Sequence, residues 1–245
     1  VSNGYGSQNR AEPDLTSDDS SGFGGGIYIL NAGGLFVLGG SSLVLHGNTA
    51  GSYGGGIAAQ VRDTYAARTD SRIDMRGIVV TGNSSLHVRD NLAMGVGGGV
   101  NIMLWHQRKY CFSGISNFPV LLVNGTKSVV NISHNLAFVA GGLYFGTHLN
   151  RLLPNDYSAC PLNLDAAQQR YRAVVKNGGT LHVDANTIDV VINLIMKAYG
   201  SDVAEMIINE DRDSDFGKYL KASDSEKGYG AGTVMMQTTL LVQGP

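Results

Sequence analysis

The sequence predicts an all-β protein, a right-handed parallel β-helix in which the chain winds through stacked coils of short strands. Three observations predict it: abundant glycine, a recurring glycine cluster, and a recurring asparagine motif in phase with that cluster. The 245 residues include 34 glycines but only five prolines, a glycine share about twice the ordinary ~7%. Because glycine permits tight turns and close backbone approach, repeated turns are the simplest explanation.

The glycine cluster occurs four times, each time before an aliphatic residue: Gly24-Gly25-Gly26-Ile27, Gly54-Gly55-Gly56-Ile57, Gly97-Gly98-Gly99-Val100 and Ala140-Gly141-Gly142-Leu143. A degraded copy reads Gly230-Ala231-Gly232-Thr233. Successive clusters are 30, 43 and 43 residues apart. Periods of this size are typical of solenoid proteins, whose repeats bury their apolar side chains by stacking.

The asparagine motif, aliphatic-x-aliphatic-x-x-Asn, also occurs four times: Leu43-x-Leu45-x-x-Asn48, Leu86-x-Val88-x-x-Asn91, Val130-x-Ile132-x-x-Asn135 and Leu181-x-Val183-x-x-Asn186. Three of the four copies continue to an Ala two residues on. Alternation places the aliphatic residues inward and the residues between them, Val44, His87, Asn131 and His182, outward. We expect the four asparagines to stack as a structural ladder that bonds the local backbone and the next coil.

Three strands account for the shortest coil, at residues 26–30, 35–38 and 43–46, and polar or aromatic loops at 63–72, 105–117 and 147–161 lengthen the later coils. One domain is expected over 1–245, with an irregular lead-in at 1–19, regular coils at 20–161, an irregular or partly helical insertion at 162–221 and a final coil at 222–245. Within the insertion, 165–176 predicts an amphipathic helix, 202–208 begins with a capping pattern, and 187–196 fits helix or strand.

These two motifs resemble the polymorphic outer-membrane protein repeat, whose motifs are Gly-Gly-Ala-aliphatic and Phe-x-x-Asn. The resemblance covers about residues 20–145, with the Phe replaced by Leu45, Val88, Ile132 and Val183. It implies a β-helical passenger or ectodomain that acts in surface adhesion or assembly. It carries over no catalytic residue, because the motifs are structural.

Composition excludes several classes of partner. The formal charge is -2 and no basic block stands out, so nucleic acid is not expected. No stretch approaches the ~20 apolar residues of a membrane span. The start lacks both a signal peptide and an initiating Met, so we expect a mature or excised segment of a larger secreted or cell-surface protein.

Two features fit an extracellular glycoprotein. Cys111 and Cys160 lie in loops after equivalent glycine strands of successive coils, so stacking makes a disulfide between them sterically plausible. Two unpaired thiols are the alternative. Three sequons, at Asn83, Asn124 and Asn131, are predicted glycosylation sites.

No metal, cofactor or catalytic centre is predicted. His87 and His182 should lie two coils apart, near ~10 Å, too far to share a zinc ion. The acidic run 211–215 lacks the Gly and Glu of an EF-hand, because Phe216 and Ala222 stand there. The expected outward positions of the glycine strand contain no acid or base: Tyr28, Ala58, Asn101 and Tyr144.

The prediction is therefore a non-catalytic structural or adhesive segment that presents loops to proteins or glycans. One loop is a candidate partner surface, because it combines large anchoring side chains at Trp105, Arg108, Tyr110 and Phe112. Open coil ends predict flanking domains or neighbouring subunits. The alternatives are a carbohydrate-active β-helix enzyme, a polysaccharide lyase or hydrolase, and a glycan-binding module without turnover.

Overall fold

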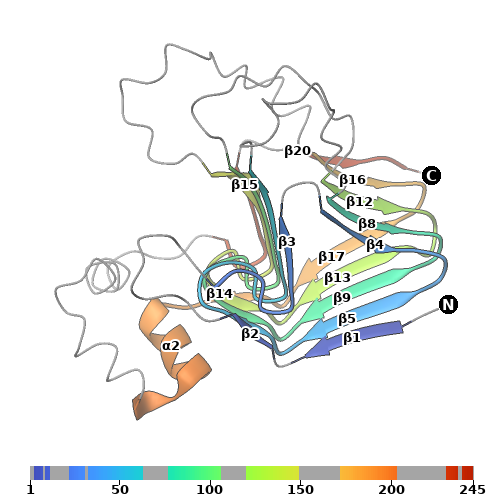
Figure 1. Ribbon diagram of the computed structural model, residues 1–245. Coiled ribbons are helices and arrows are strands. Elements are labelled where there is room, and N and C mark those ends of the chain that lie inside the picture. Colours follow the sequence, from blue (N-terminus) through green and yellow to red (C-terminus); the bar gives the residue numbers. More distant parts are fainter. Residues whose placement is uncertain are drawn as a thin grey trace, which may run out of the picture.

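The chain folds as a parallel β-helix of five coils (Figure 1). The computed structural model describes residues 3–7, 9–11, 22–30, 33–62, 77–105, 120–148, 172–202, 230–236 and 239–244. These residues form four sheets of five parallel strands, and each coil contributes one strand to each sheet. Coil 1 comprises β1 to β4, and coil 5 comprises β17 to β20. The predicted all-β parallel fold is confirmed.

Sheet A holds the strands that precede the ladder asparagines: β1 (Asn3–Ser7), β5 (Ser42–His46), β9 (Ser85–Arg89), β13 (Val129–Ser133) and β17 (Thr180–Asp184). Sheet B follows at once and its strands are shorter: β2 (Arg10–Ala11), β6 (Thr49–Ala50), β10 (Leu92–Val96), β14 (Leu136–Val139) and β18 (Thr187–Ile188).

Sheet C holds the strands that follow the glycine clusters: β3 (Ile27–Leu30), β7 (Ile57–Arg62), β11 (Val100–Trp105), β15 (Leu143–His148) and β19 (Thr233–Met236). Sheet D closes each coil with β4 (Gly34–Val37), β8 (Gly77–Thr81), β12 (Leu121–Asn124), β16 (Arg172–Lys176) and β20 (Thr239–Val242).

The core is a column of aliphatic side chains that point inward from every second strand position. In sheet A, Leu45, Val88 and Ile132 stack in register and are at most 2% exposed. Their neighbours in sheets C and D join the same hydrophobic cluster. The predicted inward residues of sheet A therefore have the predicted orientation, because alternation in a strand sends successive side chains to opposite faces.

Each coil has four strands, whereas the sequence predicted three. The missing strand is that of sheet B, which is only two residues long in β2, β6 and β18. Two residues are too few for alternation to be visible in a sequence. The alanines two residues after the ladder asparagines mark this sheet, since Ala50, Ala93 and Ala137 stack as a fully buried column.

The two segments expected to be irregular contribute regular strands. Residues 3–7 and 10–11 of the expected lead-in are β1 and β2, which extend sheets A and B to coil 1. The helix predicted over 165–176 is wrong for 172–176, which form β16 between β12 and β20. Pairing on both edges favours a strand there whatever the local pattern.

One helix, α2 (Val191–Tyr199), lies against the outer face of sheet B (Figure 1). Its apolar residues Leu194, Ile195 and Ala198 pack on Met94 and Phe138 of sheet B. The sequence left the segment 187–196 open between helix and strand. It contains both, because β18 is followed by most of α2.

The predicted asparagine ladder is confirmed and runs through all five coils. The backbone N–H and the side-chain Nδ2 of Asn48 both donate to Asn91 Oδ1 at 2.9 Å. The same paired bonds join Asn91 to Asn135 and Asn135 to Asn186, at 2.9–3.0 Å. Asn9 begins the ladder by donating twice to Asn48 Oδ1, at 3.0 and 3.1 Å.

Each ladder amide also bonds the coil before it. Asn91 Nδ2 donates to the Leu45 carbonyl at 3.2 Å, and Asn135 Nδ2 donates to the Val88 carbonyl at 2.9 Å. The ladder therefore joins neighbouring coils, as expected, whereas the bonds expected to the local backbone are absent among the described residues. Because Asn48, Asn91 and Asn135 are at most 1% exposed, the bonds between coils satisfy groups that would otherwise be buried without partners.

Packing against the ladder explains why the glycine cluster keeps phase with the asparagine motif. A Cβ atom on Gly99 would lie 2.8 Å from Asn135 Nδ2 and 2.8 Å from the Gly142 carbonyl oxygen. One residue earlier in the equivalent cluster, a Cβ on Gly55 would lie 2.5 Å from the Leu92 carbonyl oxygen. Only glycine lets these backbones approach the ladder and the next coil so closely.

Asn91→Ala should lower the free energy of unfolding by about 2–4 kcal/mol, because it leaves several buried donors and acceptors without partners. Urea unfolding followed by far-ultraviolet circular dichroism measures this change. Asn124→Ala is the matched control: Asn124 is half-buried and has one side-chain bond, to Asn177 at 2.7 Å, so a loss of about 1 kcal/mol or less is expected. Equal losses in the two variants would contradict a structural role for the ladder.

Candidate functional site

The outer face of sheet A carries many polar side chains. Strand alternation and in-register stacking place its outward side chains in three rows across the coils. The first row contains the four residues predicted to face outward: Val44, His87, Asn131 and His182. The second row contains His46, Arg89, Ser133 and Asp184. The third row joins Ser42, Ser85, Val129 and Thr180.

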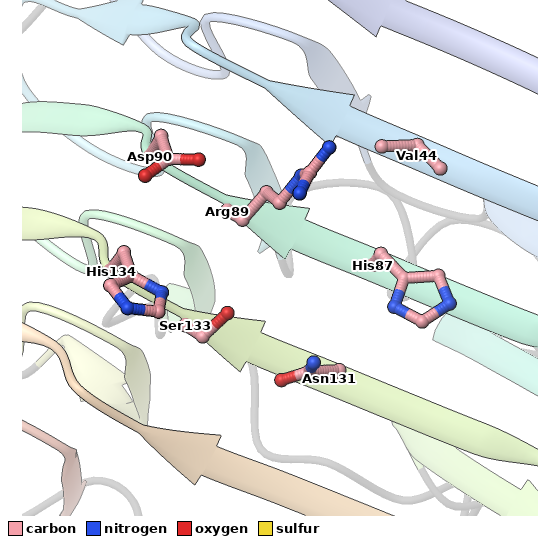
Figure 2. Close-up of a pocket in the computed structure, with 7 residues that line it drawn as sticks. All are labelled: Val44, His87, Arg89, Asp90, Asn131, Ser133 and His134. Atoms are coloured by element: carbon pink, nitrogen blue, oxygen red, sulfur yellow. The ribbon is translucent and has the colours of Figure 1, made fainter.

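A hollow of about 590 Å³ lies over the middle of this face (Figure 2). Strands β5, β9 and β13 and the turns after β9 and β13 supply its lining: Val44, His87, Arg89, Asp90, Asn131, Ser133 and His134. In Figure 2, Arg89 extends from β9 toward β5, and His87 and Asn131 lie together at the other end of the hollow.

Two turn residues line the hollow because they lie next to ladder asparagines in the chain. Asp90 and His134 immediately precede ladder asparagines and have φ values of +55° and +57°. This left-handed conformation turns the chain from sheet A into sheet B, and asparagine, aspartate and histidine tolerate it better than most residues. The ladder and the hollow are thus built from adjacent positions of the same turn.

The hollow contains few formal charges. Asp90 Oδ2 lies 3.2 Å from His46 Nε2 of the preceding coil. Arg89 forms no ion pair with any of the described residues. Burial lowers the pKa of His87, and the nearby Arg89 guanidinium lowers that pKa further. His87 is therefore a neutral imidazole at neutral pH, which can both donate and accept a hydrogen bond.

Asn131 lies at the centre of this face with an unsatisfied amide. Its neighbours in register are His87 and His182, and its Oδ1 is buried without a hydrogen-bond partner. An unpartnered buried polar atom is costly, and a bound group would supply the missing bond only after the Asn131 side chain rotates toward the hollow. Together, the hollow offers imidazole, amide, hydroxyl, guanidinium and carboxylate groups, which suit a ligand with many hydroxyl groups.

The outward residues of sheet C are mostly buried, although the sequence led us to expect an exposed row. Tyr28, Ala58, Asn101 and Tyr144 do share a row, but only Tyr28 is exposed, at 41%. Ala58 and Asn101 are 0% exposed and Tyr144 is 7% exposed. Tyr53, Val96 and Val139, which precede the glycine clusters, pack over this face with Met103 and Tyr144. The sequence analysis did not predict this layer, because its residues follow the strands of sheet B, which were not predicted either.

The predicted glycosylation sites lie at different depths. Asn83 is exposed in the turn between β8 and β9, with φ of +63°. Asn124 is half-buried at the end of β12, and Asn131 faces outward from β13 as predicted. Their glycosylation stays a prediction.

The predicted disulfide and most of the predicted partner loop fall outside the described residues: Cys111, Cys160, Arg108, Tyr110 and Phe112. The backbone of Trp105 ends β11 and pairs with Arg62 and His148.

The sequence missed Arg89, Asp90, Ser133 and His134 as site residues. Strand alternation predicts an outward position for two of them, because Arg89 and Ser133 follow the outward residues His87 and Asn131 by two positions. No group of three or more His, Cys, Asp or Glu side chains within the described ranges is arranged to hold a metal ion.

The fold and this face define the class of protein: a parallel β-helix with an exposed hydrogen-bonding hollow. No family model matches the chain, and no match was found among curated proteins or solved structures. In the described part of the chain, no helix is long and apolar enough to cross a membrane.

Arg89→Gln should raise the pKa of His87 but leave it below 6.5, because burial, the larger cause of the shift, remains. Titration of the imidazole resonance by NMR measures the pKa. Lys127→Gln is the control, since Lys127 lies in an exposed turn outside the hollow lining. An unchanged pKa in Arg89→Gln would contradict this electrostatic picture.

Stability should depend on pH through the same group. Because the folded-state pKa of His87 lies below the unfolded value of 6.5, the folded state binds fewer protons than the unfolded state below that pH. The contribution of His87 is therefore present above pH 6.5 and lost as the pH falls through the folded-state pKa. His87→Gln should reduce this acid-side decline in urea unfolding.

Proposed function

We propose that the chain is a non-catalytic structural or adhesive segment of a larger secreted or cell-surface protein. The observation that carries the proposal is the unbroken ladder, which joins five coils through buried side-chain bonds. Four parallel strand pairings accompany the ladder at each of the four coil junctions. Such bonding supports a stiff scaffold, whose parts keep their relative positions under load.

The chain connections suit display. Three long segments, 63–76, 106–119 and 149–171, each join a strand of sheet C to the strand of sheet D that follows it. Because these connections leave stacked strands, their starting points lie one above another along the helix (Figure 1). The predicted partner loop, with Arg108, Tyr110 and Phe112, belongs to the second of these connections. A scaffold with several long connections that start at one corner fits a role in contacts with proteins or glycans.

Glycan binding at the hollow of sheet A is the second candidate, favoured by the unsatisfied amide of Asn131 and its polar neighbours. The alternative of a carbohydrate-active enzyme has weaker support. Glycoside hydrolysis generally uses two carboxyl groups. Asp90 is the one carboxylate that lines the hollow, and it pairs with His46.

Incubation with a panel of neutral and acidic polysaccharides tests the proposal. We expect no new reducing ends and no unsaturated products, measured by reducing-sugar assay and by ultraviolet absorbance. Product formation that Asp90→Asn abolishes would overturn the non-catalytic assignment.

Binding without product would support the glycan candidate, and its location is testable. Binding at the hollow should fall about tenfold or more in Asn131→Ala, because a bound polar group would lose its partner. Binding through the loop should instead fall in Tyr110→Ala. Lys127→Ala is the control for both, and unchanged binding in all three variants would contradict both locations.

An extracellular location predicts particular covalent features. Protein purified from a eukaryotic secretory host should carry glycans on Asn83, Asn124 and Asn131 and a bridge between Cys111 and Cys160. Peptide mass spectrometry with and without reduction measures both. Bare asparagines together with free thiols would contradict the proposed location.

A further inference from the structure

The hollow on sheet A lies over coils 2 to 4, and its lining is almost wholly polar. Its volume of about 590 Å³ lies within the ~300–1,000 Å³ that is usual for small-molecule sites. The strands that line it, β5, β9 and β13, are consecutive in sheet A, so it extends over two strand spacings, or ~10 Å, along the helix axis. Val44 is the single apolar residue among the seven that line it. The hollow therefore has the size and polarity for a short oligosaccharide.

Arg89 gives the hollow a positive charge that no carboxylate neutralises. Its side chain is exposed, extends from β9 toward β5 (Figure 2), and forms no ion pair with any described residue. Its neighbours in the same outward row are His46 and Ser133. A guanidinium presents its N–H donors in a planar fork that matches two oxygens of a carboxylate or a similar oxyanion. The free fork is therefore suited to an anionic group of a ligand.

The nearby carboxylates leave room for such an anion. Asp90 is the one carboxylate in the lining, and its Oδ2 lies 3.2 Å from His46 Nε2. In Figure 2, Asp90 lies at the turn after β9, whereas Arg89 points away from that turn toward β5. Asp184 follows Ser133 in the row of Arg89, two coils away, which is ~10 Å and beyond the ~8 Å screening length at physiological salt. An anion bound to Arg89 on the β5 side thus avoids both carboxylates.

Uncharged hydrogen-bonding groups surround the Arg89 cation. Burial and the Arg89 charge both lower the pKa of His87, so this side chain is a neutral imidazole at neutral pH. A neutral imidazole donates from one ring nitrogen and accepts at the other. The Ser133 hydroxyl and the exposed His134 ring lie on the next strand and its turn. Because sugar hydroxyls also both donate and accept, these groups match the substituents of a sugar ring beside one anionic group.

We propose that the hollow binds an acidic glycan, with an anionic group of the sugar on Arg89 and neighbouring hydroxyl groups on His87 and His134. Carboxylates, as in uronic or sialic acids, and sulfate esters share this chemistry. A neutral glycan leaves the Arg89 fork unused, and an inorganic anion leaves the rest of the hollow unused. The inference rests on the glycan-binding candidate of the proposed function and names the ligand class of that site.

A glycan array tests the ligand class on the 245-residue chain. The array carries oligosaccharides with uronate, sialate or sulfate groups together with neutral ones, and we expect binding to acidic members. Isothermal titration calorimetry then compares the acidic glycan that binds best with its neutral form, made by methyl esterification or by desulfation. The neutral form should bind about tenfold or more weakly, because Arg89 loses its charged partner. The acidic glycan that binds shows whether the group is a carboxylate or a sulfate.

Two results of these titrations would overturn the proposal. One is equal affinity for the acidic glycan and its neutral form. The other is affinity for sulfate ion alone that equals the affinity for the glycan, because the hollow is then an anion site without sugar recognition.

Variants of Arg89 test the location. Arg89→Gln should bind the acidic glycan about tenfold more weakly than the wild type. Arg89→Lys keeps the charge but lacks the planar fork, so its affinity should lie between the two. Lys127→Gln is the matched control, because it removes a cation from an exposed turn outside the lining. Equal losses in Arg89→Gln and Lys127→Gln would indicate nonspecific charge attraction and would overturn the site.

Asp90→Asn should have the opposite effect. Removing a negative charge from the lining should strengthen binding of the acidic glycan by about twofold to threefold. The fold should tolerate the change, because asparagine adopts the left-handed φ of +55° at this position as readily as aspartate. Weaker binding by this variant would overturn the arrangement, since it would make the Asp90 carboxylate a ligand contact.

The imidazole of His87 reports where the anion lies. Because the Arg89 charge lowers the pKa of His87, an anion on Arg89 should raise that pKa. NMR titration of His87 at saturating ligand should give a higher pKa in the acidic complex than in the neutral one. The same pKa in both complexes would overturn the placement of the anion on Arg89.

Failure of this inference is distinguishable from failure of the proposed function. Equal binding of acidic and neutral glycans would overturn the acidic ligand class alone. Absence of binding to every glycan would overturn the glycan-binding candidate as well, and would leave the scaffold proposal standing. New reducing ends in the same mixtures would overturn the non-catalytic assignment.

Discussion

The buried asparagine ladder is the constraint on which the rest of this structure depends. The amides of Asn48, Asn91 and Asn135 each join three successive coils, and these bonds form only where the coils are one strand spacing apart and in register. The neighbouring glycines follow from this geometry, because a Cβ on Gly99 would meet both the ladder and the next backbone. The left-handed residues before the asparagines of coils 2 to 5 follow as well, since they turn the chain sharply out of sheet A. Two sequence motifs therefore express one structural requirement.

The same register organises the exposed surface. Because the inward residues of sheet A must stack, the outward residues between them stack too, which aligns His87, Asn131 and His182 across three coils. The hollow arises beside this row, where the turn residues Asp90 and His134 project next to the ladder. A polar surface with an unsatisfied amide is thus a consequence of the scaffold's own geometry, and it needs no separate loop to support it.

Much of this was predictable from the residues alone. Leu45, Val88 and Ile132 were identifiable as core residues because strand alternation has a period of two. The asparagines of coils 2 to 5 were identifiable because the aliphatic residues before them repeat. Asn9 was missed for the converse reason, since Gly4 and Gly6 take the places of those aliphatic residues in β1. Residues 172–176 were misread as helical because their local pattern is apolar, whereas their strand state depends on partners in coils 3 and 5.

By itself, the sequence determined the period of the coils, the inward face of sheet A and the phase of glycine and asparagine, because these depend on spacing along the chain. The tertiary structure decided what depends on contacts between coils. It added the short strands of sheet B and buried Ala58 and Asn101 under a second layer. It also brought Arg89, Asn131 and His134 to one hollow. No single segment encodes these features, since each depends on which side chains the stacking register makes neighbours.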